Sequence, residues 1–441
     1  MRLQNLLPAV SLLAAFSELP TTLAWGAAGH EIVATIAQMH LHPSVLPRLC
    51  TLLNYTSNDP SQPQCHLAPI ATWADRIRFR MRWSAGLHYI GALDDHPRST
   101  CSYPGERGWA GKRGGNVLGG IGNTTSILKE WVEDAQAVGD YYDDKANEAL
   151  KFLVHFLGDM HMPLHLTGRD RGGNSDKVLF SNRVTNLHSV WDSLLIAKAL
   201  RTVPPKYSRP LPSRKIEYNL RGTIYDAYVR RIMWEGILGR WRDDVDDWLS
   251  CPVPQEDASL GLKLSERIFS AWSQFSGFNP VSAWRVLFHT PATEEGAAAE
   301  FDDAYLCPYS WSKPIHALNC AIVWPQALDE PPYNETHLNF MSDDADSHHH
   351  SHQLSPEAEA DLVDDAGRFI AGQHPLDGSI NNNPRRQYIE LDTPEYAGVV
   401  EKEWIIEKLM AQAGIRLAGV LNWLFVEDEE RERAGLRVAG F

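Results

Sequence analysis

The sequence predicts an all-α fold, a mainly helical single domain with few short strands. Apolar residues recur at helical spacing over several long segments, whereas strand-like segments are sparse. Apolar residues make up 44% and charged residues 22% of the 441 positions, which is ordinary for a globular protein and excludes a wholly disordered or collagen-like chain. The 15 Trp, 14 Tyr and 14 Phe can fill a large core.

The expected elements follow from apolar periodicity and from residues that begin or end helices. Thr124 is the expected N-cap of the second helix. The third helix should end before Pro163, because proline cannot continue a helix. The best strand is 177–180. The expected helices are 31–41, 125–138, 146–162, 189–200, 218–249 and 401–424.

The first 24 residues have the pattern of a secretory signal peptide. Arg2 supplies the charge, a short apolar run follows, and small residues precede a cut after Ala24. The apolar run has about eleven residues, too few to span a membrane, and no later run reaches about 18. We therefore expect a secreted protein that is not held in a membrane after cleavage.

Two stretches of the mature chain have the composition of insertions. The second contains a histidine-rich run at 348–352, for which a solvated loop is favoured over an extra metal site. The expected divisions are a domain at 25–427, insertions near 252–304 and 334–384, and a C-terminal tail at 428–441.

Secretion also changes how the cysteines are interpreted. Six cysteines, an even number, indicate three disulfide bonds in an oxidising compartment, and 15 pairings are possible. Zinc binding by cysteine is disfavoured because no Cys-x-x-Cys pair exists. Three sequons predict N-glycosylation at Asn54, Asn123 and Asn334.

The charge balance limits the possible partners. Asp and Glu outnumber Lys and Arg by 56 to 41, which gives a net charge of −15. A broad basic surface for nucleic acid is therefore not expected. Any phosphate ligand must instead be met by local cations or by metal ions.

Histidine–aspartate pairs carry the chemical signal. His155 and Asp159 are four residues apart, as are His188 and Asp192, so each pair lies on one helix face. One such pair is usually a structural hydrogen bond. Two pairs within 40 residues, with further His and Asp upstream, are hard to explain by packing, because buried His and Asp are costly unless paired or metal-bound. Ligands of this kind without cysteine suit zinc in an open hydrolytic site.

Other histidines have no such pattern and are expected to be structural. They are His40, His42, His66, His96 and His316.

Six short motifs within residues 25–195 identify a resemblance. They are Trp25-Gly26-x-x-Gly29-His30, Trp73-Ala74-Asp75, His88-Tyr89, His155-x-x-x-Asp159-x-His161-x-Pro163-x-His165, Gly172-Gly173-Asn174 and Asn186-Leu187-His188-x-x-Trp191-Asp192. In these motifs the chain resembles the trinuclear-zinc, single-strand-specific nucleases of the S-one/P-one type. The chain end matches more loosely and the two insertions do not match. The resemblance implies the all-α fold of the zinc-phospholipase-C/nuclease type.

The resemblance also implies three Zn²⁺ ions. Asp75, His88, His155 and Asp159 would hold the first, His165, His188 and Asp192 the second, and Trp25, His30 and Asp159 the third. Trp25 would bind through its free amine and its carbonyl, and Asp159 would bridge the first and third ions. His161 and Pro163 would shape the turn instead of binding metal.

The implied activity is that of a secreted endonuclease. It would hydrolyse single-stranded DNA and RNA to 5′-phosphorylated nucleotides, with a metal-bridged hydroxide as the nucleophile. Asp75 and Asp159 would be catalytic through the metals, and Arg78 would contact the phosphate as negative charge builds. Tyr89 would stack on a base, and Asn174 would bind substrate. We expect a monomer.

One departure from the family leaves base preference open. The family commonly has an aspartate two residues after the stacking position, where this chain has Gly91. Asp94 or Asp95 could replace it. The ratio of DNA to RNA hydrolysis, the pH optimum and the role of the insertions also stay open.

Disulfide pairing is implied in part by the resemblance. Cys50 and Cys65 close a short loop, and in the family the counterpart of Cys101 pairs with a late cysteine, here Cys320. That choice leaves Cys251 with Cys307.

Two other functions are compatible with the same motifs. A secreted zinc-dependent phospholipase C, or another phosphodiesterase, shares the amino-terminal Trp and the His–Asp spacing. A secreted zinc-binding protein without activity is the second alternative, although all nine ligand positions are present.

Overall fold

The computed structural model describes residues 25–251, 294–303, 305–334 and 388–427. Helices dominate them, and the only described strands form one small hairpin, so the all-α expectation is confirmed. No helix in these ranges combines the length and apolar character needed to cross a membrane. The expected signal peptide, the histidine run, most of both insertions and the whole tail lie outside the described residues.

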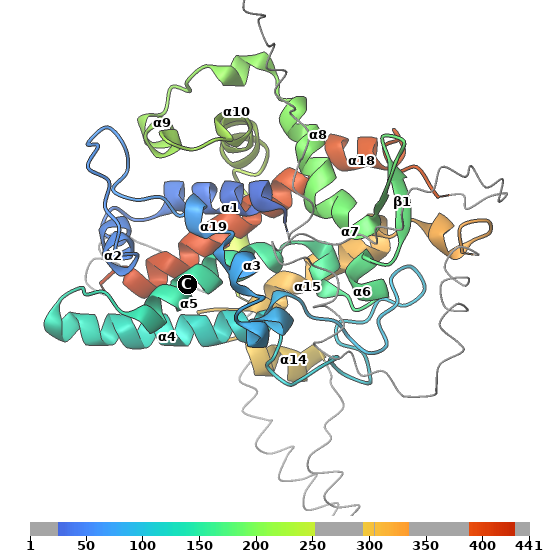
Figure 1. The fold of residues 1–441 in the computed structure, drawn as a ribbon, viewed down its shortest axis with the longest axis horizontal. Coiled ribbons are helices and arrows are strands. Elements are labelled where there is room, and N and C mark those ends of the chain that lie inside the picture. Colours follow the sequence, from blue (N-terminus) through green and yellow to red (C-terminus); the bar gives the residue numbers. More distant parts are fainter. Residues whose placement is uncertain (1–24, 252–293, 304, 335–387, 428–441) are drawn as a thin grey trace, which may run out of the picture.

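Three long helices form the centre of the molecule (Figure 1): α1 (Ala27–His40), α5 (Asp144–Asp159) and α19 (Ile405–Phe425). Helix α1 packs along α19, and α4 (Val117–Val138) packs along α5. Gly414 permits the first contact, because a Cβ there would come within 2.6 Å of Ile36 Cγ2. Below these helices in the view lies α4, and above α1 lie α9 and α10.

Shorter elements connect the long helices and carry much of the candidate site. They are α2 (Val45–Leu52), η1 (Ala68–Ile70), α3 (Trp73–Ile77), η2 (Arg82–His88), η3 (Pro163–Leu166), α6 (Asp170–Gly173), β1 (Lys177–Phe180), β2 (Arg183–Asn186), α7 (Leu187–Ser189), η4 (Val190–Leu194), α8 (Leu195–Arg201), η5 (Pro205–Ser208), α14 (Glu294–Phe301), α15 (Pro308–Leu318), η7 (Asn319–Val323) and η8 (Gln326–Asp329). The expected strand 177–180 is confirmed as β1, which pairs antiparallel with β2.

The expected cap at Thr124 is wrong, because α4 begins seven residues earlier. Asn116 caps it by accepting a hydrogen bond from the Gly119 amide, and Thr124 donates to the Gly120 carbonyl within the helix. Gly119, Gly120 and Gly122 lie near this end of the helix, and a glycine-rich sequence of this kind is typical of a loop. In the structure a Cβ at Gly120 would lie only 3.1 Å from the Phe156 ring, so glycine lets α4 approach α5 closely.

Two expected long helices are broken. The range 218–249 contains parts or all of four elements: α9 (Arg214–Leu220), α10 (Asp226–Arg231), the π-helical η6 (Ile232–Arg240) and α11 (Val245–Leu249). Gly222 interrupts this range with φ +85°. The range 401–424 is divided between α18 (Ala397–Lys402) and α19 at Trp404, whose φ of 58° is left-handed.

The three disulfide bonds join the cysteine pairs expected above. Cys50 bonds with Cys65, Cys101 with Cys320 and Cys251 with Cys307. Asn54 and Asn123 are exposed, as a glycosylation acceptor must be, whereas Asn334 is half-buried.

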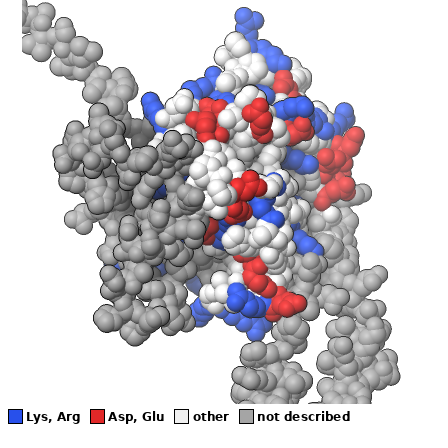
Figure 2. Space-filling model, turned by 90° about the vertical axis from the view of Figure 1, so that its right-hand side faces the viewer, with Lys and Arg blue, Asp and Glu red and all other residues white. Residues whose placement is uncertain are grey.

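The described surface has no broad field of positive charge on the face shown in Figure 2. Lys and Arg are interspersed there with Asp and Glu. This face therefore offers no large basic surface that could attract a nucleic acid.

Candidate metal centre

Three clusters of His and Asp meet where α1, α3, α5 and η4 come together. Within each cluster the possible ligand atoms lie no more than 4.8 Å apart. The clusters are His30, His155 and Asp159; Asp75, His88 and His155; and His165, His188 and Asp192. The structure thus brings together all eight side chains that the resemblance implied as metal ligands.

Asp159 lies at the middle of the clusters. Its Oδ2 is 3.0 Å from His88 Nδ1 and 3.2 Å from His155 Nε2. Its Oδ1 is 3.4 Å from His30 Nε2 and 3.5 Å from His165 Nδ1. One carboxylate therefore faces groups of all three clusters.

The donor set fits bound cations. Seven of the eight side chains are buried. Both carboxylate oxygens of Asp75 and of Asp192, together with one of Asp159, are buried without a hydrogen-bond donor. Leaving such oxygens unpaired is costly, so positive charge is needed at this place. Burial and the neighbouring Asp75 and Asp159 raise the pKa of Asp192 well above its usual range, which shows the same excess of negative charge.

Backbone carbonyls orient three of the imidazole rings by accepting hydrogen bonds from Nδ1. His155 Nδ1 donates to the Ala71 carbonyl at 2.7 Å, and His165 Nδ1 donates to the His88 carbonyl at 2.7 Å. His188 Nδ1 donates to the Gly172 carbonyl at 2.8 Å. Each bond fixes the tautomer with Nε2 unprotonated, the form that binds a metal.

His161 is different, although it lies between two cluster residues. Its Nδ1 donates to the Leu157 carbonyl at 2.7 Å, and its Nε2 accepts a hydrogen bond from Arg416 at 2.8 Å. Both ring nitrogens are thus used within the protein. His161 also belongs to none of the three clusters.

Gly158 makes room for the imidazole of His30, and Gly29 makes room for the side chain of Trp25. A Cβ at Gly158 would lie 2.5 Å from His30 Nδ1, and the His30 ring stacks on that of His155 at 3.9 Å. At Gly29 a Cβ would lie 3.0 Å from the Trp25 side chain. Gly158 was missed in the sequence, although a glycine inside a strongly periodic helix is a signal for close packing.

Trp25 is fully buried at the start of the described chain. The next amide, that of Gly26, donates to the Asp192 carbonyl at 2.8 Å. This bond ties the segment before α1 to η4, which carries a cluster residue.

The three expected substrate residues differ in their surroundings. Arg78 Nη1 is 3.8 Å from Asp75 Oδ1, and its side chain is 23% exposed, so it adds a cation at the edge. Tyr89, directly after His88, is 43% exposed and can contact a ligand. Asn174 is half-buried and its amide donates to the Arg171 carbonyl at 2.8 Å.

Gly91 lies against another backbone segment. A Cβ there would come within 2.5 Å of the Gly168 amide nitrogen. The family's aspartate therefore does not fit this backbone without a shift. Asp95 does not replace it, because Asp95 is buried and accepts hydrogen bonds from Thr167 Oγ1 and the Ser102 amide.

A fourth group of possible ligands has a structural explanation. Asp95, Cys101 and His316 lie together, but Cys101 is bonded to Cys320. His316 Nε2 is 3.0 Å from Asp95 Oδ2, and its ring stacks on Tyr103. These contacts give His316 the structural role expected from its isolated position in the sequence.

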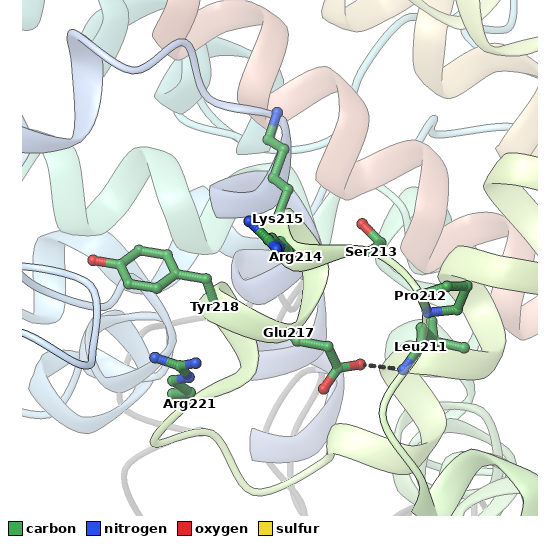
Figure 3. A pocket seen from close by; sticks show the side chains of 8 residues that line it. All are labelled: Leu211, Pro212, Ser213, Arg214, Lys215, Glu217, Tyr218 and Arg221. Carbon is green, nitrogen blue, oxygen red and sulfur yellow. Dashed lines mark hydrogen bonds between the residues drawn. The ribbon is translucent and has the colours of Figure 1, made fainter.

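A surface cavity of about 770 Å³ lies elsewhere, at α9 (Figure 3). The backbone amide of Leu211 donates to Glu217 there, and Arg221 lies 5.8 Å from the Tyr218 ring centroid. No residue of the three clusters lines this cavity. The cavity is therefore not part of the candidate metal centre.

Sequence comparisons show that the chain is similar to proteins named as nucleases. Endonuclease 2 of Arabidopsis thaliana is 34% identical over 252 residues, which cover 55% of this chain and 76% of that protein. Endonuclease 3 of the same plant is 32% identical over 290 residues, 62% of this chain and 86% of that protein. Nuclease P1 of Penicillium citrinum is 36% identical over 180 residues, 40% of this chain and 60% of that protein.

A family model described as S1/P1 Nuclease matches residues 25–269. This range contains every residue of the three clusters. The match covers more than half of the chain, and the resemblance stated from the motifs is confirmed. The chain belongs to the S1/P1 nuclease family.

Proposed function

We propose that this nuclease is a secreted, zinc-dependent endonuclease that hydrolyses single-stranded DNA and RNA to 5′-phosphorylated nucleotides. The observation that carries the proposal is the position of Asp159, within 3.5 Å of ring nitrogens from all three clusters. A carboxylate so placed can bridge cations. Histidine and carboxylate donors without cysteine favour zinc in a hydrolytic site.

Of the proposed ligand sets, His165, His188 and Asp192 would hold one ion and are the same three residues as one cluster. Asp75, His88 and His155, another cluster, would hold a second ion together with Asp159, whose Oδ2 is 3.0 Å from His88 Nδ1. Trp25, His30 and Asp159 would hold a third. The role of Trp25 requires the free amine that cleavage after Ala24 would create.

Bound zinc lowers the pKa of water toward neutrality and offers positive charge to phosphate oxygens. The chain supplies the remaining functions. The carbonyls of Ala71, His88 and Gly172 hold three imidazoles in the metal-binding tautomer. Arg78, 3.8 Å from Asp75, can donate to a phosphate oxygen and stabilise the charge that develops there.

Single-strand preference is supported by the exposed ring of Tyr89. It directly follows His88, so a base stacked on it would lie beside the clusters. A flexible strand can present a phosphate to a buried centre and splay a base onto this ring. A duplex would first have to lose pairing. Asn174 is proposed to contact the same strand.

The test uses protein purified from the medium of expressing cells. Hydrolysis of single-stranded DNA, single-stranded RNA, duplex DNA and phosphatidylcholine is measured before and after treatment with a chelator, and zinc is counted by mass spectrometry. We expect rapid hydrolysis of both single strands, loss of activity with the chelator and recovery on adding zinc.

Each contrary result has a distinct meaning. Preference for phosphatidylcholine would favour the zinc-dependent phospholipase C. Bound zinc without any hydrolysis would favour the zinc-binding protein. Full activity after exhaustive removal of metal would reject the metal mechanism.

A further inference from the structure

The segment between the cluster residues Asp75 and His88 alternates cationic and apolar side chains. Arginine stands at positions 76, 78, 80 and 82, and Ile77, Phe79, Met81 and Trp83 stand between and after them. No acidic residue occurs from 76 to 87, although the whole chain has a net charge of −15. The positive charge of this segment is therefore local and unneutralised within it.

The later residues of this segment are open to solvent. Trp83 is 65% exposed, Phe79 is 36% exposed, and the side chains of Arg80 and Arg82 are also exposed. No carboxylate among the described residues pairs with Arg80 or Arg82. The other two arginines have partners, since Arg76 donates to the Pro69 carbonyl and Arg78 lies near Asp75.

Trp83 is held in place despite its exposure. Its ring lies 5.6 Å from that of Phe152, which stacks on Phe156 at 5.2 Å. Phe156 in turn meets the ring of His88 edge-on at 5.4 Å. The exposed indole thus packs against α5, the helix that carries His155 and Asp159. A rigid aromatic ring exposed beside free cations is the arrangement by which proteins bind single-stranded nucleic acid.

We propose that Arg80, Arg82 and Trp83 bind the strand that flanks the scissile phosphate. The two guanidinium groups contact backbone phosphates, and the indole of Trp83 stacks on a base outside the metal centre. This inference rests on the proposed nuclease function, since it needs a nucleic-acid substrate. If Arg80, Arg82 and Trp83 bind the flanking strand, a long strand should be hydrolysed more efficiently than a dinucleotide.

The test compares a dinucleotide with a single strand of about 20 nucleotides, long enough to cover a site of this kind. The variants are Trp83→Ser and the double variant Arg80→Gln/Arg82→Gln. Their matched controls are Trp234→Ser, at an indole 43% exposed in η6, and Arg209→Gln, at an exposed arginine. Substrates extended only on the 5′ side or only on the 3′ side locate the strand.

We expect Trp83→Ser to lower kcat/KM on the long strand at least about fivefold, while kcat/KM on the dinucleotide stays within about twofold. The double arginine variant should lower the slope of log kcat/KM against log salt on the long strand by about 1.4, because two phosphate contacts are lost. The control variants should match the unaltered protein.

The inference would be overturned if, in both variants, the ratio of kcat/KM on the long strand to kcat/KM on the dinucleotide were the same as in the unaltered protein. It would also be overturned if the control variants lost as much kcat/KM on the long strand as the test variants. Equilibrium binding of a strand with hydrolysis-resistant phosphorothioate linkages separates this result from failure of the proposed function. If the unaltered protein hydrolyses nothing yet binds the strand through Trp83, the function is wrong and the binding surface stands. If binding is also unaffected by the variants, the surface is wrong.

Discussion

The guanidinium of Arg416 donates a hydrogen bond to Nε2 of His161 over 2.8 Å, and both side chains are buried. Burial lowers the pKa of Arg416 to about 9. Burial and the Arg416 charge hold the pKa of His161 well below its usual range, so the ring accepts as a neutral group. The bond ties α19 to the turn between Asp159 and His165, two proposed ligands.

Replacing Arg416 by methionine should therefore destabilise the protein by about 2–4 kcal/mol. The change keeps an apolar stem but leaves His161 Nε2 and the Trp248 carbonyl without their donor. Urea unfolding of the zinc-loaded protein measures the effect. Arg242→Met, at an exposed arginine, is the control and should shift the free energy of unfolding little. Equal stability of the two variants would contradict the buried bond's importance.

The same pair shows where sequence reasoning stops. The motif around His161 placed this residue in a turn between ligands, but its partner Arg416 is 255 positions away. Nothing local in the sequence indicates that contact. The grouping of the proposed ligands was predictable, because His155 and Asp159 repeat the spacing of His188 and Asp192 and stand in a known order of motifs.

Gly158→Ala should remove metal from the cluster that contains His30. The added methyl would lie 2.5 Å from His30 Nδ1, so the ring must shift and its Nε2 would lose its present position 3.4 Å from Asp159 Oδ1. We expect mass spectrometry to find about one zinc fewer per chain, with a loss of activity of about tenfold or more.

Gly122→Ala is the matched control, in the interior of α4. No atom lies within 4 Å of a Cβ built there. This change should leave zinc content intact and stabilise the protein by about 0.5–1 kcal/mol, because alanine favours the helix. Full zinc content in Gly158→Ala would show that His30 has more freedom than the structure indicates.

Asp159→Asn should impair turnover more than His165→Asn. Asp159 faces ring nitrogens of His30, His88, His155 and His165, whereas His165 belongs to one cluster. Turnover of a dinucleotide is measured together with zinc content for both variants. Equal losses of turnover at equal zinc content would argue against a bridging carboxylate.

Helix boundaries were less predictable than ligands, for reasons visible at particular residues. At Trp404 the backbone turns left-handed, and the indole lies 4.3 Å from the Arg231 guanidinium, a tertiary contact that helical periodicity does not reveal. At Gly120 the sequence resembles a loop, yet the absent side chain lets two helices touch. In both places packing overrides local preference.

The stability of the fold should fall on mild acidification partly through His40. Its Nδ1 donates to the Ile36 carbonyl, and burial lowers the pKa of His40 to about 4, against about 6.5 in the unfolded chain. Since the folded pKa is depressed, the stabilisation is complete above pH about 6.5 and is lost as the pH falls toward 4. His40→Gln cannot take up this proton and should have a flatter profile.

The measurement is the free energy of unfolding of both proteins across that pH range. Between neutral pH and pH about 4.5 the unaltered protein should lose on the order of 2 kcal/mol more than His40→Gln. Protonation of metal ligands affects both proteins alike, so the difference isolates His40. His96→Gln, at an exposed histidine, is the control and should keep the unaltered profile. Parallel curves for His40→Gln and the unaltered protein would reject the assignment.

Activity should require a chain that begins at Trp25. The proposed third ion needs the α-amine of this residue, because an amide nitrogen has no available lone pair for a metal. Trp25 is buried, and the Gly26 amide is fixed 2.8 Å from the Asp192 carbonyl, so the start of α1 has a defined place beside the clusters. An α-amine has a pKa near 8, and zinc can displace its proton near neutral pH.

We expect protein starting at Trp25 to bind three zinc ions and to hydrolyse single-stranded DNA rapidly, whereas protein with one additional Met should bind about one ion fewer and react slowly. Zinc content and initial rates of the two forms, refolded side by side from the same reduced material with zinc, provide the measurement. Three ions and equal rates in both forms would remove the amine from the ligand set and leave His30 and Asp159 to hold that ion alone.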